Sequence, residues 1–120
     1  MSEEALQKLL SQFSYFIADQ DFDHKDWERV TIEQGAYETA SRVDRFFRSW
    51  KWGDEDRAHN TLRFLKSLCD RGDEDTALAI MNQAFNLVDG AKSTQIENYP
   101  ALQALEDEKA ADADNVPLFA

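Results

Sequence analysis

Residues 53–88, GDEDRAHNTLRFLKSLCDRGDEDTALAIMNQAFNLV, contain one helix-start signal twice, nineteen residues apart. In both copies a glycine ends one helix, the next aspartate (Asp54 or Asp73) can cap the following helix, and further acids meet the positive end of its dipole. The stretch therefore predicts two antiparallel helices of equal length that pack face to face. Their apolar positions fall in the same phase: Ala58, Leu62, Leu65, Leu68 and Cys69 in the first helix, and Ala77, Met81, Ala84, Leu87 and Val88 in the second.

The Gly72-Asp73 turn of this hairpin joins Leu62, Phe64 and Leu68 of the first helix to Ala77, Met81 and Ala84 of the second. With these residues the hairpin resembles one tetratricopeptide repeat over residues 58–90. Thr61 and Leu65 stand where the repeat carries a tryptophan and a small residue, and a solenoid usually needs three or more repeats. The resemblance implies a helix hairpin, and it leaves open both kinship with the repeat family and shared hairpin geometry alone.

Two helical segments are expected upstream of this hairpin. The first begins at the N-cap Ser2 and ends near Asp19. The second runs over residues 26–52. Glycine and the β-branched residues before it weaken a helix, so whether this segment breaks or kinks near Gly35 stays open. Gly53 then supplies a left-handed cap. The buried stripes are Leu6, Leu9, Leu10, Phe13, Phe16 and Ile17 in the first segment, and Ala36, Ala40, Val43, Phe47 and Trp50 after the break.

The C-terminal part predicts one more short helix and a tail. Pro100 at a first helical position opens a helix to about Ala111, with Leu102 and Leu105 as its main apolar residues. The fold class predicted is all-α: a compact bundle of four to five helices with antiparallel helix hairpins in residues 1–111. Residues 112–120 show no periodicity and predict a flexible, acidic and apolar C-terminal tail. A chain of 120 residues has room for one such domain.

The composition is strongly acidic. The chain has 24 Asp and Glu residues against 13 Lys and Arg, a formal net charge of −11, which repels nucleic acid and anionic membranes at long range. Of the segments 1–28, 29–52, 53–92 and 93–120, only residues 29–52 carry more cations than acids. No apolar run approaches the ~20 residues of a membrane span, the N-terminus lacks signal-peptide features, and the single Cys69 predicts a buried thiol in a reducing compartment. We therefore expect a soluble, cytoplasmic protein.

No residues show the spacing that catalysis or metal binding requires. Asp19, Asp21 and Asp23 match the first ligands of an EF-hand loop, but His24 and Val30 stand where a glycine and the closing glutamate are needed. The chain also lacks the paired Glu-x-x-His motifs of a di-iron bundle, a nucleophile with its base, and a phosphate-binding glycine loop. We predict that the protein is not an enzyme and that it uses no metal or other cofactor.

The segment Arg42–Trp52 is the most unusual part of the sequence. At about 100° per residue, a helical wheel places Val43, Phe46, Phe47 and Trp50 on one face. Arg45, Arg48 and Trp52 fall together on the opposite face. One interpretation is a core face backed by solvated cations near a helix C-terminus. The other is a partner interface, because Trp and Arg are enriched in binding hot spots.

Acids and the tail are further candidates for partner binding. Asp54, Glu55 and Asp56 gather at one turn and Asp73, Glu74 and Asp75 at the next, where they either solubilise and cap helices or imitate duplex phosphates, as DNA-mimic inhibitors do. In the tail, Leu118 and Phe119 follow acids, which is similar to bacterial sliding-clamp-binding peptides and to the tips of single-stranded-DNA-binding proteins. The alternative is that both side chains pack onto the body.

The leading hypothesis is a non-enzymatic acidic helical module that binds a protein partner as an adaptor or inhibitor. The alternatives are a DNA-mimic inhibitor of a nucleic-acid-binding protein, of phage or bacterial anti-defence type, and an accessory subunit of a nucleoprotein or enzyme complex. No direct contact with nucleic acid or membrane is expected, and homo-oligomerisation stays open. The predicted contact residues are Arg45, Arg48, Trp52, Asp54, Glu55, Asp56, Asp73, Glu74, Asp75, Leu118 and Phe119.

Overall fold

The computed structural model describes residues 2–88, 98–103 and 105. Within these residues the chain is all-helical, which confirms the predicted fold class. The elements are α1 (Glu3–Ala18), α2 (His24–Glu33), α3 (Tyr37–Arg42), α4 (Phe46–Trp52), α5 (Arg57–Asp70), α6 (Glu74–Leu87) and the short 3₁₀ helix η2 (Pro100–Leu102). The predicted tail, and with it the boundary after residue 111, lies outside the described residues.

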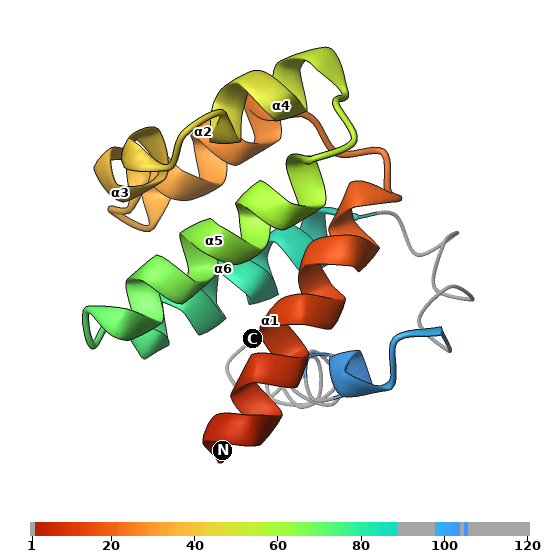
Figure 1. Ribbon diagram of the computed structural model, residues 1–120, viewed down its shortest axis with the longest axis vertical. Helices are drawn as coiled ribbons and strands as arrows, with labels where there is room; N and C mark the ends of the chain where they lie inside the picture. Colours follow the sequence, from red (N-terminus) through yellow and green to blue (C-terminus); the bar gives the residue numbers. More distant parts are fainter. Residues whose placement is uncertain (1, 89–97, 104, 106–120) are drawn as a thin grey trace, which may run out of the picture.

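Helix α5 is the central element of the bundle and contacts α1, α3, α4 and α6. In Figure 1, α1 crosses α5 on one side, with η2 beside α1, while α2, α3 and α4 form a layer on the other side. Helices α5 and α6 have 14 residues each and run antiparallel, as the repeated start signal predicted. Helices α2, α3 and α4 therefore form a layer that covers the α5–α6 hairpin.

The core between this layer and the hairpin is aromatic. Trp27 of α2 is fully buried, and its ring makes edge contacts with Phe46, Trp50 and Phe64, at centroid distances of 5.3, 5.6 and 6.3 Å. Phe22, just before α2, closes the cluster at 5.1 Å from Trp27. Tilted and edge-to-face geometry is favourable for aromatic pairs beyond the burial of their area. One cluster thus joins α2, α4 and α5.

Helix α1 follows the sequence prediction closely. Ser2 is its N-cap, with the side-chain oxygen accepting from the backbone N–H of Ala5 at 3.1 Å, and Asp19 is its C-cap. All six predicted apolar side chains are buried. Both its ends and its inward face were therefore readable from capping and spacing.

The segment predicted as one long helical stretch, with the question of a break at Gly35 left open, consists of three helices. The break at Gly35 is present, with a left-handed φ of +69°. A second break at residues 43–45 was missed: Arg45 adopts φ +65°, a conformation that costs a side-chain-bearing residue about 1 kcal/mol. The interruption rotates α4, so that Phe46 is fully buried while Val43 and Phe47 are only partly buried. Because of it, the described residues contain more helices than the predicted four to five.

In the two glycine-aspartate signals, the glycines end helices as predicted, but the aspartates do not cap the helices that follow. Gly53 and Gly72 end α4 and α5 with φ of +66° and +84°. However, Asp73 makes no side-chain cap bond to α6, and α5 begins at Arg57, with Asp54 in the preceding turn. On the predicted stripes Leu87 is exposed, whereas the unpredicted Phe64, Ile80 and Phe85 are buried. At the C-terminal side, Pro100 opens η2, and Leu102 and Leu105 are buried.

Candidate functional site

A surface hollow of about 470 Å³ lies between the start of α2 and the face of α4. We call it the α2–α4 hollow. Its volume falls in the range of ligand pockets, although it is open to solvent. The structure brings the predicted Arg48 and Trp52 together here. The other lining residues are His24 and Glu28 of α2 and Phe47 and Lys51 of α4.

Local capping fixes both walls of the hollow. Asp23 forms a capping box with Asp26: its carboxylate accepts from the backbone N–H groups of Lys25 and Asp26 at 2.9 and 3.1 Å, while its own N–H donates to the Asp26 carboxylate at 3.0 Å. These bonds make His24 the first residue of α2. On the other wall, Gly53 ends α4, so Trp52 projects from its last position with 68% of its surface exposed.

The aromatic surface of the hollow continues beyond its lining. The Lys51 ammonium lies 5.4 Å from the centre of the Trp52 ring, within range of a cation–π interaction. Phe47 packs against the exposed Tyr37 of α3 at 5.2 Å and against the buried Phe46 at 5.1 Å. Phe47 is therefore held firmly between the core and the surface.

The two cations of the hollow, Arg48 and Lys51, differ from the other three cations of residues 29–52, the basic segment. Arg29 and Arg42 each pair with a glutamate one turn away, Glu33 and Glu38. Arg48 and Lys51 form no ion pair within the described part of the chain. Two neighbouring positive charges are thus left available at this surface.

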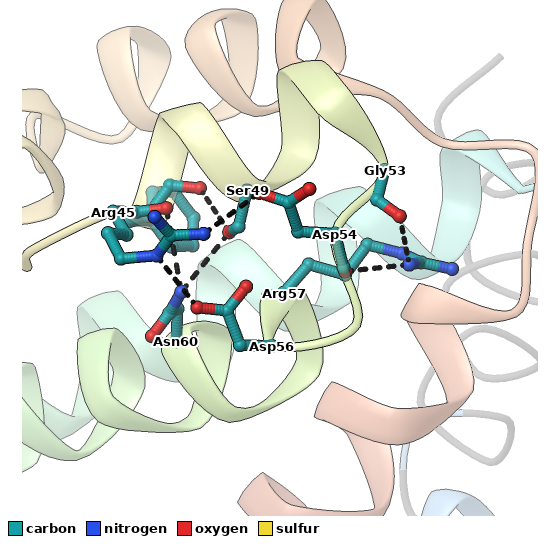
Figure 2. A network of polar contacts seen from close by, with 8 residues as sticks. Arg45, Ser49, Gly53, Asp54, Asp56, Arg57 and Asn60 are labelled. Atoms are coloured by element: carbon teal, nitrogen blue, oxygen red, sulfur yellow. Dashed lines mark hydrogen bonds and ion pairs between the residues drawn. The ribbon is translucent and has the colours of Figure 1, made fainter.

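Arg45 does not lie with Arg48 and Trp52, which corrects the helical-wheel prediction. Its guanidinium turns toward the α4–α5 turn, where it donates to Asp56 at 3.0 Å and to Asp54 at 2.9 Å (Figure 2). The wheel assumed one continuous helix through residues 42–52, and the break at Arg45 invalidates that assumption. The hydrogen bond from Arg45 lowers the pKa of the Asp56 carboxyl, and the same pair raises the pKa of Arg45.

Further polar bonds lock α4 onto α5. The side-chain amide of Asn60 donates to the Ser49 hydroxyl at 3.2 Å, and Arg57 donates to the carbonyls of Gly53 and Asp54 at 3.0 and 2.8 Å (Figure 2). Arg57 also reaches the carbonyl of Ala18 at the end of α1. The α4–α5 turn is therefore rigidly connected to three helices.

The predicted acidic residues occupy two separate places. Glu55 lies exposed at the α4–α5 turn beside the paired Asp54 and Asp56, while Asp73, Glu74 and Asp75 lie at the other end of α5. A helix of this length separates its ends by about 20 Å. Leu118 and Phe119 lie outside the described residues, and so do the acids of the predicted tail.

A second hollow, of about 330 Å³, contains the single cysteine. Cys69 is half-buried and not fully buried as predicted. Burial raises the pKa of its thiol, and the nearby carboxylates of Glu74 and Asp70 raise it further, so the thiol is protonated at neutral pH. This environment is the opposite of one that activates a nucleophile. Glu3, Leu6 and Gln7 of α1 complete the lining.

The described residues contain no group of three or more His, Cys, Asp or Glu side chains placed to hold a metal ion. Of the EF-hand-like run, Asp23 caps α2 and Asp19 accepts a hydrogen bond from the Tyr99 hydroxyl at 3.0 Å. In the part of the chain that the structure covers, no helix combines the length and apolarity needed to cross a bilayer.

Comparison with known families gives a match to the family described as AbiJ N-terminal domain 5, over residues 2–113. No tetratricopeptide family is recognised. Comparison with the curated proteins and with the solved structures gives no match. The matched family is an abortive-infection domain, which associates the chain with bacterial defence. Because the match covers nearly all of the sequence, the chain belongs to the AbiJ N-terminal domain 5 family.

Proposed function

We propose that the chain is a non-enzymatic recognition module of a bacterial abortive-infection system, and that it binds a protein partner through the α2–α4 hollow. The observation that carries this proposal is Trp52, a tryptophan with 68% of its surface in solvent, next to two cations that lack ion pairs in the described structure. Tryptophan and arginine together are typical of residues that dominate binding energy at interfaces.

A partner that covers Trp52 buries a large apolar area. Covering Trp52 removes roughly 150 Å² of apolar surface from water, which at about 25 cal/mol per Å² gives roughly 4 kcal/mol before the costs of association. The ring projects from a helix end that Gly53 and the Arg57 bonds hold in place. Little conformational freedom of the backbone is therefore lost when a partner binds.

The DNA-mimic alternative has less support in this geometry. A mimic presents rows of free carboxylates, whereas Asp54 and Asp56 are both paired with Arg45. The second acidic group lies about 20 Å away, at the far end of α5. Adaptor, inhibitor and accessory subunit are three forms of one binding role, and the family match favours a place within a defence system over an anti-defence role.

The test compares Trp52→Ala with a matched control, Tyr15→Ala. Tyr15 is an exposed aromatic residue on α1 with no place in the hollow lining. Tagged versions of the full chain are expressed in a host that carries the abortive-infection system, and captured proteins are quantified by mass spectrometry at low and high salt.

We expect Trp52→Ala to lose a partner that the parent protein and Tyr15→Ala both retain at low and at high salt, because salt weakens the contacts of Arg48 and Lys51 but not the apolar contact of Trp52. A charge mimic would instead lose its partner steeply as salt rises. Equal capture by the parent and Trp52→Ala would contradict the proposal. Circular dichroism of both variants checks that the fold is intact.

A further inference from the structure

We infer that the α2–α4 hollow takes a short acidic segment of a partner protein, with carboxylates against Arg48 and Lys51 and an apolar side chain against Phe47 and Trp52. This inference rests on the proposed binding role and adds the chemistry of the partner. It follows from the distribution of charge, from the limits of the cationic surface and from the aromatic lining.

The position of the two unpaired cations makes them informative. Lys25, Arg63 and Lys66 also form no ion pair among the described residues, but they do not line the hollow, whereas Arg48 and Lys51 line it together with the exposed Trp52. Arg29, Arg42 and Arg45 of the basic segment all form ion pairs. Arg48 and Lys51, one helical turn apart on α4, form no ion pair with the described residues. A carboxylate brought by a partner is the complement of this pair.

The cationic surface is small and has acids on both sides. Glu28 stands in its α2 wall, and Asp54 and Glu55 follow directly after Trp52 and Gly53. Charges within about 8 Å of one another still interact at physiological salt. A nucleic-acid strand that extends beyond the hollow meets these carboxylates, whereas a segment with a few acids does not. The geometry therefore favours a peptide over a strand of nucleic acid.

The lining supplies the apolar half of the contact. Phe47 is held between Tyr37 and Phe46 and does not need to be ordered when a ligand binds. Trp52 presents an exposed ring with the Lys51 ammonium nearby. An apolar side chain that enters between Phe47 and Trp52 places adjacent acids next to Arg48 and Lys51. An acidic segment interrupted by a phenylalanine or leucine has this chemistry.

The experiment uses the full chain and a fluorescein-labelled peptide, Ser-Asp-Glu-Phe-Asp-Glu-Ser-Gly, followed by fluorescence anisotropy. A second peptide replaces every acid by its amide, and a third probe is an oligothymidine of similar length. The test variant is Arg48→Ala with Lys51→Ala. Its matched control is Arg63→Ala with Lys66→Ala, an exposed pair on α5 with the same residue types, the same spacing and no place in the hollow lining.

We expect the acidic peptide to bind about tenfold more tightly than its amide, and the 48/51 variant and Trp52→Ala each to lose about tenfold in affinity. The 63/66 variant, which has the same net charge as the 48/51 variant, should stay within about twofold of the parent. Tighter binding of the oligothymidine overturns the inference in favour of nucleic acid. Equal binding of the amide peptide, equal loss in the 63/66 variant, or no saturable binding up to ~1 mM also overturns it.

The two proposals fail in different ways. If the acidic peptide does not bind while Trp52→Ala still loses a partner captured by the parent chain, the binding role stands and the acidic chemistry is wrong. If partner capture is indifferent to Trp52, the binding role itself fails.

Discussion

Replacing Thr61 by valine tests how α4 is held on α5. The indole N–H of Trp50 donates to the Thr61 hydroxyl at 2.9 Å, and both side chains are buried. Thr61 in turn donates to the carbonyl of Arg57, one turn earlier in α5. Valine keeps the shape of the side chain but removes the acceptor, so the buried indole N–H of Trp50 loses its partner.

The expected cost is that of an unsatisfied buried donor, about 1–3 kcal/mol in the free energy of unfolding. For a domain of this size, each kcal/mol lowers Tm by about 4 °C. The carbonyl of Arg57 remains the normal helical acceptor for the backbone N–H four residues on, so little is lost there. The effect therefore comes almost entirely from the Trp50 bond.

Thr31→Val is the matched control. Thr31 is also fully buried within a helix, and it donates to the carbonyl of Trp27 at 2.7 Å, but no side chain donates to it in the described structure. Urea unfolding followed by far-UV circular dichroism gives both free energies, provided that the m-values stay equal. We expect Thr61→Val to be the less stable variant by at least about 1 kcal/mol. A difference under about 0.5 kcal/mol would refute the reasoning, and a double-mutant cycle with Trp50→Phe isolates the coupling.

Three further changes have defined outcomes. Asp23→Ala removes the capping box of α2 and should cost about 1 kcal/mol at neutral pH. The backbone hydrogen bond from Asp26 lowers the pKa of Asp23. The difference in unfolding free energy between the parent and Asp23→Ala should therefore be complete above the ordinary carboxyl pKa of about 4 and should be lost as pH falls through the lowered pKa of Asp23. Urea midpoints that differ as much well below the carboxyl pKa as they do at neutral pH would contradict this. Gly53→Ala should cost about 1 kcal/mol through left-handed strain alone, since an added Cβ meets nothing within 4 Å, and a neutral result in thermal unfolding would count against it. Cys69 should react with iodoacetamide at pH 8 more slowly than free cysteine does, because burial and two carboxylates raise the pKa of its thiol; equal rates, measured by intact mass, would show that the thiol is not shielded.

Capping chemistry and apolar spacing made much of the fold predictable. Ser2 and the regular apolar positions defined α1, and Gly35, Gly53 and Gly72 marked places where a helix can end because glycine readily adopts the left-handed conformation that all three show. The break at Arg45 has no such signal, since arginine rarely adopts positive φ. It exists where Asp54 and Asp56 bind the guanidinium, and those contacts come from the tertiary structure.

Only part of the candidate site could be predicted from the sequence, because the rest depends on tertiary contacts. Arg48 and Trp52 were singled out because they lie close together in one unusual segment. His24 and Glu28 were missed as lining residues, because they reach the hollow only when α2 packs beside α4. Arg45 was placed with Trp52 because a helical wheel contains no information about where a helix is interrupted.

The three tryptophans occupy two different environments. Trp27 and Trp50 lie in the aromatic core, whereas Trp52 projects into water. We therefore expect acrylamide or iodide to quench the emission of Trp52 much more strongly than that of Trp27 and Trp50. Trp52 is thus a natural fluorescent reporter in the lining of the hollow. Its fluorescence can report the binding of an unlabelled ligand, separately from unfolding of the core around Trp27 and Trp50.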